Sequence, residues 1–437
     1  MHYIPGIPMP RAGRQLAEDM PYAGATDEGE HSATAMRDPH PPDGAPAAEA
    51  PQIDVGRQQQ ARRYARQSHT LALIDWLIST AVILVFLIGG LSFALRDALA
   101  PAAAWRPLPH WAPLQLAAYF AVLYGILLVL GLPLSVYGGY TLPHRYGIST
   151  QRLRAWIADQ LKGQALTLIF LLAAVEFVYL LLATTPNAWW LWVGGAMLLF
   201  TVLLANLAPV LLVPLFYKLT PLPDGVLKER LLALAALTRT RVRGIYTMNL
   251  SARTRAANAM VMGLGNTRRI IIGDTLLAEF APDEIEVVVA HELGHQVHHD
   301  IFRMVIAQTI ITLGGLYLVN LVLHSVVGAV PGYRGLADAA TMPLVAAALG
   351  VFGLITMPLS NGLSRRAEHR ADVYALDTTH DTAAFIGAMT RLANQNLAET
   401  DPAPWVEWLL HSHPAVGRRI AFARRYAALA GPRRAAG

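Results

Sequence analysis

The chain has 437 residues, of which 54% are hydrophobic and only 15% are charged, a composition that excludes an ordinary soluble domain and is typical of an integral membrane protein. It contains no cysteine, which excludes disulfide bonds and thiolate metal ligands. Its net charge of +5 predicts contact with membrane phosphates, not with nucleic acid.

Residues 1–56 differ in kind from the rest of the chain. They are rich in proline, alanine, glycine and acidic residues and have almost no apolar periodicity. They contain no continuous apolar core of the kind that a signal peptide requires. We therefore expect a disordered acidic tail on the cytoplasmic side.

Six apolar stretches follow, each long enough to cross a hydrocarbon core, which needs about 20 residues. Four of them form an expected membrane bundle over residues 57–216, and two more occupy residues 304–360. Asp75 and Glu176 lie inside spans, where a carboxylate is a functional-site candidate by default. The stretches lie near residues 70–95, 112–137, 165–185, 189–216, 304–329 and 340–360.

The basic residues between the spans predict the orientation. One set of flanks carries nearly all of them, and the opposite loops hold only Arg96, Arg106 and Arg334. By the positive-inside rule the N-terminus is cytoplasmic, and an even number of spans returns the C-terminus to the same side. The basic flanks contain Arg57, Arg62, Arg63, Arg66, Arg145, Arg152, Arg154, Lys162, Lys218, Lys228 and Arg230.

Two polar pieces of the chain, residues 217–303 and residues 361–437, are expected to form one cytoplasmic catalytic domain. The first piece opens with a helical pattern over Val226–Leu237, and the second contains another over Thr382–Leu397. Three β-like runs lie at Gly244–Met248, Asn258–Met262 and Arg269–Ile272. The predicted fold is therefore mainly α, a polytopic membrane protein of about six spans with a zincin-like α+β catalytic domain.

The first piece ends with His291-Glu292-Leu293-Gly294-His295, which spells H-E-x-x-H within a helix expected over Ala281–His299. Residues four apart share a helix face, so His291 and His295 can bind one metal ion. Glu292 lies one residue along, where its carboxylate can accept a proton from a water molecule whose pKa zinc lowers to about 7. Incidental histidines on a surface helix are the less favoured alternative.

A third ligand is expected downstream, because two histidines and a carboxylate are a usual catalytic zinc set. Glu368 is the best candidate, and Asp372 lies four residues later on the same expected helix. One of these carboxylates could bind zinc while the other accepts the ring N–H of a ligand histidine. A solvated charged turn containing Arg365, Arg366 and Arg370 is the alternative, and the rival ligands are His369, His411 and His413.

The order of these motifs resembles that of the integral-membrane zinc metalloproteases typified by the CAAX prenyl endopeptidase. The matching blocks are the H-E-x-x-H, the segment Asn361 to Asp372, and His411-Ser412-His413-Pro414. The run Ala257-Asn258-Ala259, followed by residues 268–277, is similar to the family's edge strand ahead of the metal helix. The resemblance covers roughly residues 57–430.

The resemblance implies one zinc ion per chain, a peptide or protein substrate, and a role for each matching residue. Glu292 would be the general base, and Asp372 would support the ligands from behind. Asn258 would lie on a strand that pairs with the substrate backbone, and His413 would contact the oxyanion or the substrate. The implied zinc ligands are His291, His295 and Glu368.

The sequence also allows two functions other than that of a prenyl endopeptidase. The first alternative is a protease for quality control of membrane or unfolded proteins. An arginine- and alanine-rich composition is typical of a bacterial inner-membrane protein, and prenylated substrates are not expected in bacteria. The second is a scaffold that holds zinc without catalysis, against which Glu292 argues, because a structural site needs no base. The polar flanks of the H-E-x-x-H argue against a protease whose metal helix lies within the membrane.

Overall fold

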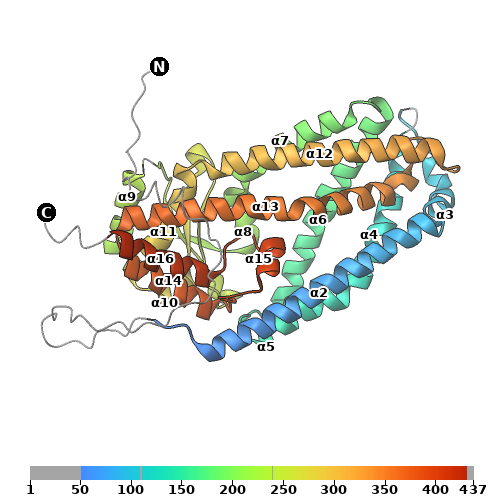
Figure 1. Ribbon diagram of the computed structural model, residues 1–437. Helices are drawn as coiled ribbons and strands as arrows, with labels where there is room; N and C mark the ends of the chain where they lie inside the picture. Colours follow the sequence, from blue (N-terminus) through green and yellow to red (C-terminus); the bar gives the residue numbers. More distant parts are fainter. Residues whose placement is uncertain (1–50, 109–110, 239, 431–437) are drawn as a thin grey trace, which may run out of the picture.

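The computed structural model describes residues 51–108, 111–238 and 240–430. In these ranges, six helices are long and apolar enough to cross a membrane, which confirms the predicted polytopic α-helical fold. They run along the long direction of the molecule, and a small sheet with several helices lies at one end (Figure 1). The six are α2 (Val55–Ile88), α4 (Pro113–Val136), α6 (Leu153–Thr184), α7 (Trp189–Leu207), α12 (Asp300–Ala329) and α13 (Met342–Thr379).

The first span begins and ends earlier than the sequence predicted. Most of the expected tail, residues 1–50, lies outside the described residues, whereas α2 starts at Val55 and ends at Ile88. The expected extent of residues 70–95 was wrong because two glycines follow Ile88, and Gly90 has φ +72°, a conformation that favours glycine. The chain then turns into the short helix α3 (Leu91–Ala98) and the 3₁₀ helix η1 (Ala100–Ala104).

Two spans contain a π-helical turn close to the sheet end. Helix α4 passes through η2 (Tyr137–Thr141) into α5 (Leu142–Arg145), and α7 passes through η3 (Ala208–Leu212) into α8 (Val213–Phe216). The second turn contains Pro209 and is followed by Pro214, and proline cannot donate a helical hydrogen bond. Short π-helical turns of this kind are often found at functional sites.

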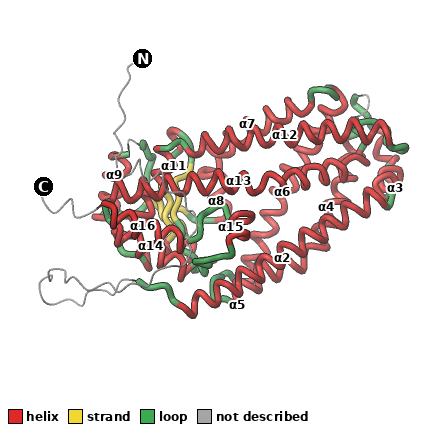
Figure 2. The backbone as a smooth tube through the Cα atoms, in the orientation of Figure 1, coloured by secondary structure: helices red, strands yellow, loops and turns green. Residues whose placement is uncertain are grey.

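The sheet has four strands in the order β1-β2-β4-β3 (Figure 2). Strands β2 (Ile245–Met248) and β4 (Arg269–Gly273) are parallel, and β3 (Ala259–Met262) pairs antiparallel with β4. The three predicted β-like runs correspond to these strands. The fourth strand, β1 (Leu219–Pro221), was not predicted because three residues that include a proline give no strand pattern.

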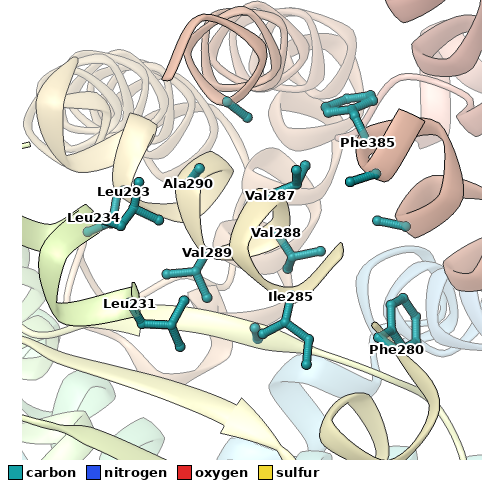
Figure 3. Packing of buried hydrophobic residues seen from close by; sticks show 14 of the residues in the cluster. Leu231, Leu234, Phe280, Ile285, Val287, Val288, Val289, Ala290, Leu293 and Phe385 are labelled. Carbon is teal, nitrogen blue, oxygen red and sulfur yellow. The ribbon is translucent and has the colours of Figure 1, made fainter. Parts of the chain in front are cut away.

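Around the sheet lie the helices α9 (Val226–Leu237), α10 (Asp274–Glu279), α11 (Pro282–Val297), α14 (Thr382–Gln395), α15 (Pro404–Leu410) and α16 (Val416–Ala430). Helix α11 is central to the main hydrophobic core. Its Ile285, Val289 and Leu293 pack with Leu231 of α9 and Phe385 of α14 (Figure 3). Each fully buried side chain of this size stabilises the fold by about 1.5–3 kcal/mol. The core therefore fixes the position of the helix that carries the H-E-x-x-H.

Helix α13 joins the membrane bundle to the sheet end. Its 38 residues span about 57 Å, which exceeds the hydrocarbon thickness of about 30 Å. Its last turns therefore project out of the bundle and pack against α11. A Cβ atom on Gly294 would lie 3.1 Å from Ala371 Cα and 3.2 Å from Tyr374 Cβ. The missing side chain of Gly294 thus makes room for α13.

Candidate metal centre

The contact between α11 and α13 brings three possible metal ligands together. Their ligand atoms, from His291, His295 and Glu368, all lie within 4.8 Å of one another. His291 Nε2 is 3.3 Å from Glu368 Oε2, and His295 Nε2 is 3.4 Å from Glu368 Oε1. The side chains of His291 and Glu368 are buried, whereas that of His295 is partly exposed. The cluster therefore opens to solvent on the His295 side.

The opposite nitrogen of each imidazole faces a carboxylate. His291 Nδ1 is 2.9 Å from Asp372 Oδ1, and His295 Nδ1 is 3.0 Å from Asp300 Oδ2. Because an ionised carboxylate accepts but cannot donate a hydrogen bond, this assigns the ring proton of each neutral histidine to Nδ1. The Nε2 lone pairs then point toward Glu368.

Three lone-pair acceptors that face one another repel unless a cation lies between them. Glu368 Oε2 is buried and has no hydrogen-bond donor among the described residues. Zinc with ligands at about 2.0–2.1 Å in a tetrahedron places neighbouring ligand atoms roughly 3.3 Å apart, close to the two distances observed here. Two imidazoles and a carboxylate also leave one position for water or substrate. The residues therefore fit a catalytic zinc ion.

Two arginines hold the supporting carboxylates in place. Arg419 of α16 donates to both oxygens of Asp372, at 2.8 and 2.5 Å. Arg370 of α13 donates to Asp300 at 2.5 Å. Each ligand histidine is thus backed by an aspartate, and each aspartate by an arginine. Such partners fix the tautomer and orientation of metal-binding histidines.

The sequence analysis missed three of these supporting residues, Asp300, Arg370 and Arg419. Asp300 had been noted only as part of a polar flank, and Arg370 only as part of a solvated turn. The spacing of Asp300, five residues after His295, was the one available signal. It is not a helical spacing, because α11 ends at Val297 and His299 adopts φ +54° before α12 begins. That turn brings Asp300 back against His295.

Glu292 lies beside the metal ligands without joining them. It is one residue after His291 and three before His295, so it shares the side of α11 that carries His295. Its side chain is partly exposed, and its charge is close enough to raise the pKa of His295. A carboxylate in this position has access both to solvent and to the open side of the cluster.

The three rival ligands occupy different places. His369 is buried with its ring against Phe422, at 4.7 Å between ring centroids, and His411 lies 6.2 Å from His69. His413 comes nearest, with Nε2 3.3 Å from Glu368 Oε1, but its side chain is 63% exposed. Among the described residues, only His291, His295 and Glu368 form a close ligand group. His413 therefore borders the cluster and does not complete it.

The loop that carries His413 is held by two residues of α13. Asn361 donates to the carbonyl of Leu409 at 2.7 Å, and Arg365 donates to the carbonyl of His411 at 2.6 Å. Both bonds satisfy carbonyl groups at the end of α15. The alternative of a solvated charged turn therefore does not hold for Arg365 or for Arg370, and the Asn361 to Asp372 block contacts two parts of the site at once.

Strand β3 lies at the edge of the sheet and packs against α11. Asn258 directly precedes this strand, with its side chain exposed, and its carbonyl accepts a hydrogen bond from Gly273 N at 2.8 Å. Antiparallel pairing alternates, so the main-chain groups of Ala259 and Val261 point away from β4. The structure thus places an open strand edge next to the helix that carries the ligands.

Replacing Asp300 with Asn is expected to lower zinc affinity by about 10–100-fold, as losses of such supporting partners typically do. The amide keeps the shape but presents a weaker acceptor to His295 Nδ1. Zinc affinity should be measured by competition with a chelator. Asp283→Asn, on the first turn of α11 and away from the ligands, is the control. Equal affinities in the two variants would exclude a supporting role for Asp300.

The imidazoles hold protons tightly when no metal is bound. Burial lowers the pKa of His295, but its hydrogen bond to Asp300 and the nearby carboxylate of Glu368 outweigh this effect and raise the pKa to about 10. Burial also lowers the pKa of His291, but the carboxylates of Asp372 and Glu368 that face its two ring nitrogens outweigh this effect and raise the pKa. Because a metal ligand must be a neutral imidazole, zinc has to displace these protons, and its affinity falls as the pH falls.

We therefore expect zinc uptake by the metal-free protein at pH 7 to release at least one proton per ion, because the pKa of about 10 keeps His295 protonated at that pH. Calorimetry in buffers that differ in protonation enthalpy measures this number directly. Affinity should rise with pH throughout the range below the raised pKa values. Uptake with no proton release at pH 7 would contradict the carboxylate contacts as the cause of the raised pKa values.

Fold and site together define an integral-membrane metallopeptidase. Residues 221–427 match the model of peptidase family M48, and residues 40–218 match a model described as the CAAX prenyl protease N-terminal region with five membrane helices. The chain belongs to this family of membrane metalloendopeptidases. The predicted family and enzyme class are confirmed.

Several known proteins are similar to the chain over most of its length. An uncharacterized metalloprotease of Bacillus subtilis, YhfN, is 28% identical over 369 residues, which are 84% of this chain and 85% of that protein. The probable CAAX prenyl protease 1 of Schizosaccharomyces pombe is 26% identical over 86% of this chain and 81% of its own. The crystal structure of S. mikatae Ste24p has a TM-score of 0.73 at 23% identity and covers 85% of this chain and 89% of that one, which shows a shared fold.

Proposed function

We propose that this zinc endopeptidase binds one zinc ion through His291, His295 and Glu368 and uses Glu292 as its general base. The observation that carries the proposal is the convergence of three acceptor side chains beside a partly exposed carboxylate, with nitrogen–oxygen distances of 3.3 and 3.4 Å across α11 and α13. When bound, zinc supplies Lewis acidity, which lowers the pKa of a water molecule and polarises a carbonyl group.

The protein's own groups carry the proton transfers. Glu292 accepts a proton from the attacking water and returns it to the leaving amine, as a carboxylate near both atoms can do in each direction. His413 is placed to donate a hydrogen bond toward the carbonyl oxygen as negative charge develops there. Its Nδ1 lies 2.9 Å from Ser412 Oγ, which leaves Nε2 on the side of the cluster.

The substrate is proposed to bind as an added strand along β3. The free main-chain groups of Ala259 and Val261 would pair with an extended peptide, and Asn258 would contact it at the start of the strand. Strand addition uses main-chain hydrogen bonds for affinity, so it tolerates varied side chains. If this binding mode is correct, Asn258→Ala should raise the KM for a peptide and leave the zinc content unchanged. An unchanged KM would count against this binding mode.

We propose further that the site and both termini face the cytoplasm, in a bacterial inner membrane. The support is the concentration of basic residues on the loops at the metal end of the bundle. A reporter fused after Gly437 should be active only when the reporter functions in the cytoplasm. Activity of an exclusively periplasmic reporter at that position would reverse the orientation.

Two classes of substrate are proposed for this protease, prenylated C-termini and unfolded or membrane proteins in general. Relatives named CAAX prenyl proteases favour a prenylated C-terminus, whereas an open strand edge that makes no demand on side chains favours unfolded or membrane proteins in general. Membranes that contain the wild-type protein and membranes that contain Glu292→Gln should be compared by proteomics. Uncleaved proteins without prenyl groups in the variant would establish quality control, and cleavage confined to farnesylated peptides would exclude it.

A further inference from the structure

A groove of about 430 Å³ lies between α2 and the π-helical turn η2, and none of the candidate metal ligands lines it. On the α2 side it is lined by Arg63, Arg66 and Thr70, and on the other side by Tyr137. The neighbouring chain is held close to α2, since Gln67 donates to Tyr146 at 3.1 Å. In Figure 1, α5, which follows η2, lies beside the N-terminal half of α2. The groove is therefore formed by defined elements and not by a loop.

The groove carries positive charge without a counter-charge. Among the residues that the structure describes, Arg63 and Arg66 form no ion pair, and both are exposed. Arg145 of α5 adds a third guanidinium, which donates to the hydroxyl of Tyr137 at 3.4 Å and likewise has no carboxylate partner in those ranges. By contrast, Arg62 on another face of α2 lies 3.9 Å from Glu399. Glu399 is thus paired outside the groove.

Below the groove, the same face of α2 becomes apolar. Helical spacing places Ile74, Leu77, Leu84 and Ile88 beneath Arg63 and Thr70, and all four side chains are exposed, at 39, 51, 45 and 82%. Asp75 is the one carboxylate in α2, and it lies on another face, where a Cβ atom on Gly131 of α4 would be 3.4 Å from its Oδ1. An exposed apolar stripe with no charge along it is what the acyl chains of a lipid require.

The change from polar to apolar fixes the depth of the arginines. At 1.5 Å per residue, Arg66 and Arg63 stand about 6 and 10 Å above Thr70 along the helix axis. The polar layer on each side of the hydrocarbon core is roughly 5–8 Å thick. Arg66 therefore lies at the level of the lipid phosphates, in the leaflet on the side of the metal centre, and the long side chain of Arg63, one turn higher, can reach down to that level.

We propose that this groove binds the headgroup phosphate of an anionic phospholipid from that leaflet. The forked guanidinium groups of Arg63 and Arg66 suit phosphate oxygens, Tyr137 offers a hydroxyl, and the acyl chains lie along Ile74 and Leu77. Basic pockets between membrane helices on this side of a bilayer are a known form of lipid recognition.

The site has a structural consequence for the catalytic end. The start of α2 is tied to the end of α14 and to the segment that follows it, since Asp54 N donates to Asn394 Oδ1 at 3.0 Å and Thr400 N donates to Gln58 Oε1 at 3.0 Å. A lipid held at Arg63 and Arg66 therefore anchors the helix that joins the bundle to the catalytic domain. This inference rests on the membrane spans and not on the proposed residue roles in catalysis.

The test uses the full-length protein with dioleoylphosphatidylglycerol, dioleoylphosphatidylcholine and inorganic phosphate as separate probes. Native mass spectrometry in detergent counts the molecules that remain bound to each chain. We expect saturable binding of phosphatidylglycerol only. The double variant Arg63→Gln, Arg66→Gln should bind it about 25-fold more weakly, since each basic residue near an anionic surface contributes roughly fivefold. Each single variant should lose about fivefold, which keeps the test open if the double variant is not stable.

The matched control is the double variant Arg152→Gln, Arg154→Gln. These arginines are exposed at the start of α6 on the same side of the membrane, and they do not line the groove. Their removal should leave phosphatidylglycerol binding within twofold of the wild type, which supports a defined site. Equal losses in the two double variants, equal binding of phosphatidylcholine, or saturable binding of inorganic phosphate alone would each overturn the proposal.

Discussion

Glu292→Gln is expected to lower the rate of peptide hydrolysis by about 10²–10⁴-fold, the usual contribution of a general base, while the zinc content stays complete. The amide has nearly the shape of the carboxylate but cannot accept the proton of the attacking water. His291, His295 and Glu368 keep their positions, because Asp372 and Asp300 orient the two histidines independently of Glu292. Hydrolysis of a quenched peptide and elemental analysis measure the two effects.

Glu286→Gln is the matched control for this variant. Glu286 lies on the same helix but accepts a hydrogen bond from Arg230 Nε at 2.9 Å, on the side that faces α9. Its replacement should leave hydrolysis within a few-fold of the wild type. Loss of zinc in Glu292→Gln comparable with that in His291→Ala would defeat the assignment of Glu292 as a base, because it would make Glu292 part of the metal-binding set.

Glu368→Ala is expected to remove most of the zinc, because it leaves two imidazoles and water as ligands. Asp372→Asn should do less, with a loss of about 10–100-fold in affinity, since Asp372 acts on zinc only through His291. Asparagine is chosen because alanine would leave the guanidinium of Arg419 buried without its partner, at a cost of about 3–5 kcal/mol. Zinc per protein, by elemental analysis, gives the order of the two effects.

His369→Ala and His413→Ala complete this comparison. The ring of His369 packs on Phe422, and His413 borders the cluster from an exposed loop. Both variants should retain zinc, although His413→Ala should slow hydrolysis if His413 contacts the substrate. Full zinc in Glu368→Ala together with loss in either histidine variant would remove Glu368 as the third ligand.

The local parts of the site could be predicted from the sequence because they depend on helix geometry alone. His291 and His295 are four residues apart on α11, and Glu368 and Asp372 are four apart on α13. The meeting of the two pairs also followed, because one helix lies just before a span and the other just after the next one. The structure adds that α13 is a single helix which carries its carboxylates out of the bundle.

The supporting residues could not be predicted, because their contacts depend on turns and on distant parts of the chain. Asp300 reaches His295 only through the left-handed turn at His299. Arg419 lies on α16, 47 residues after Asp372 in the sequence, and still contacts it. Neither contact leaves a periodic pattern. The end of α2 at Ile88 was missed for a related reason, since the apolar pattern continues past Gly89 and Gly90 although the helix does not.

We propose that this membrane protein hydrolyses peptide bonds with one zinc ion held by His291, His295 and Glu368. The most direct measurement is the hydrolysis of a quenched peptide by chelator-treated protein during titration with zinc. Activity should be absent at the start, rise linearly and stop rising at one equivalent of zinc per chain, while Glu292→Gln stays inactive at every point. Activity that survives removal of the metal, or that fails to return with zinc bound, would contradict the account.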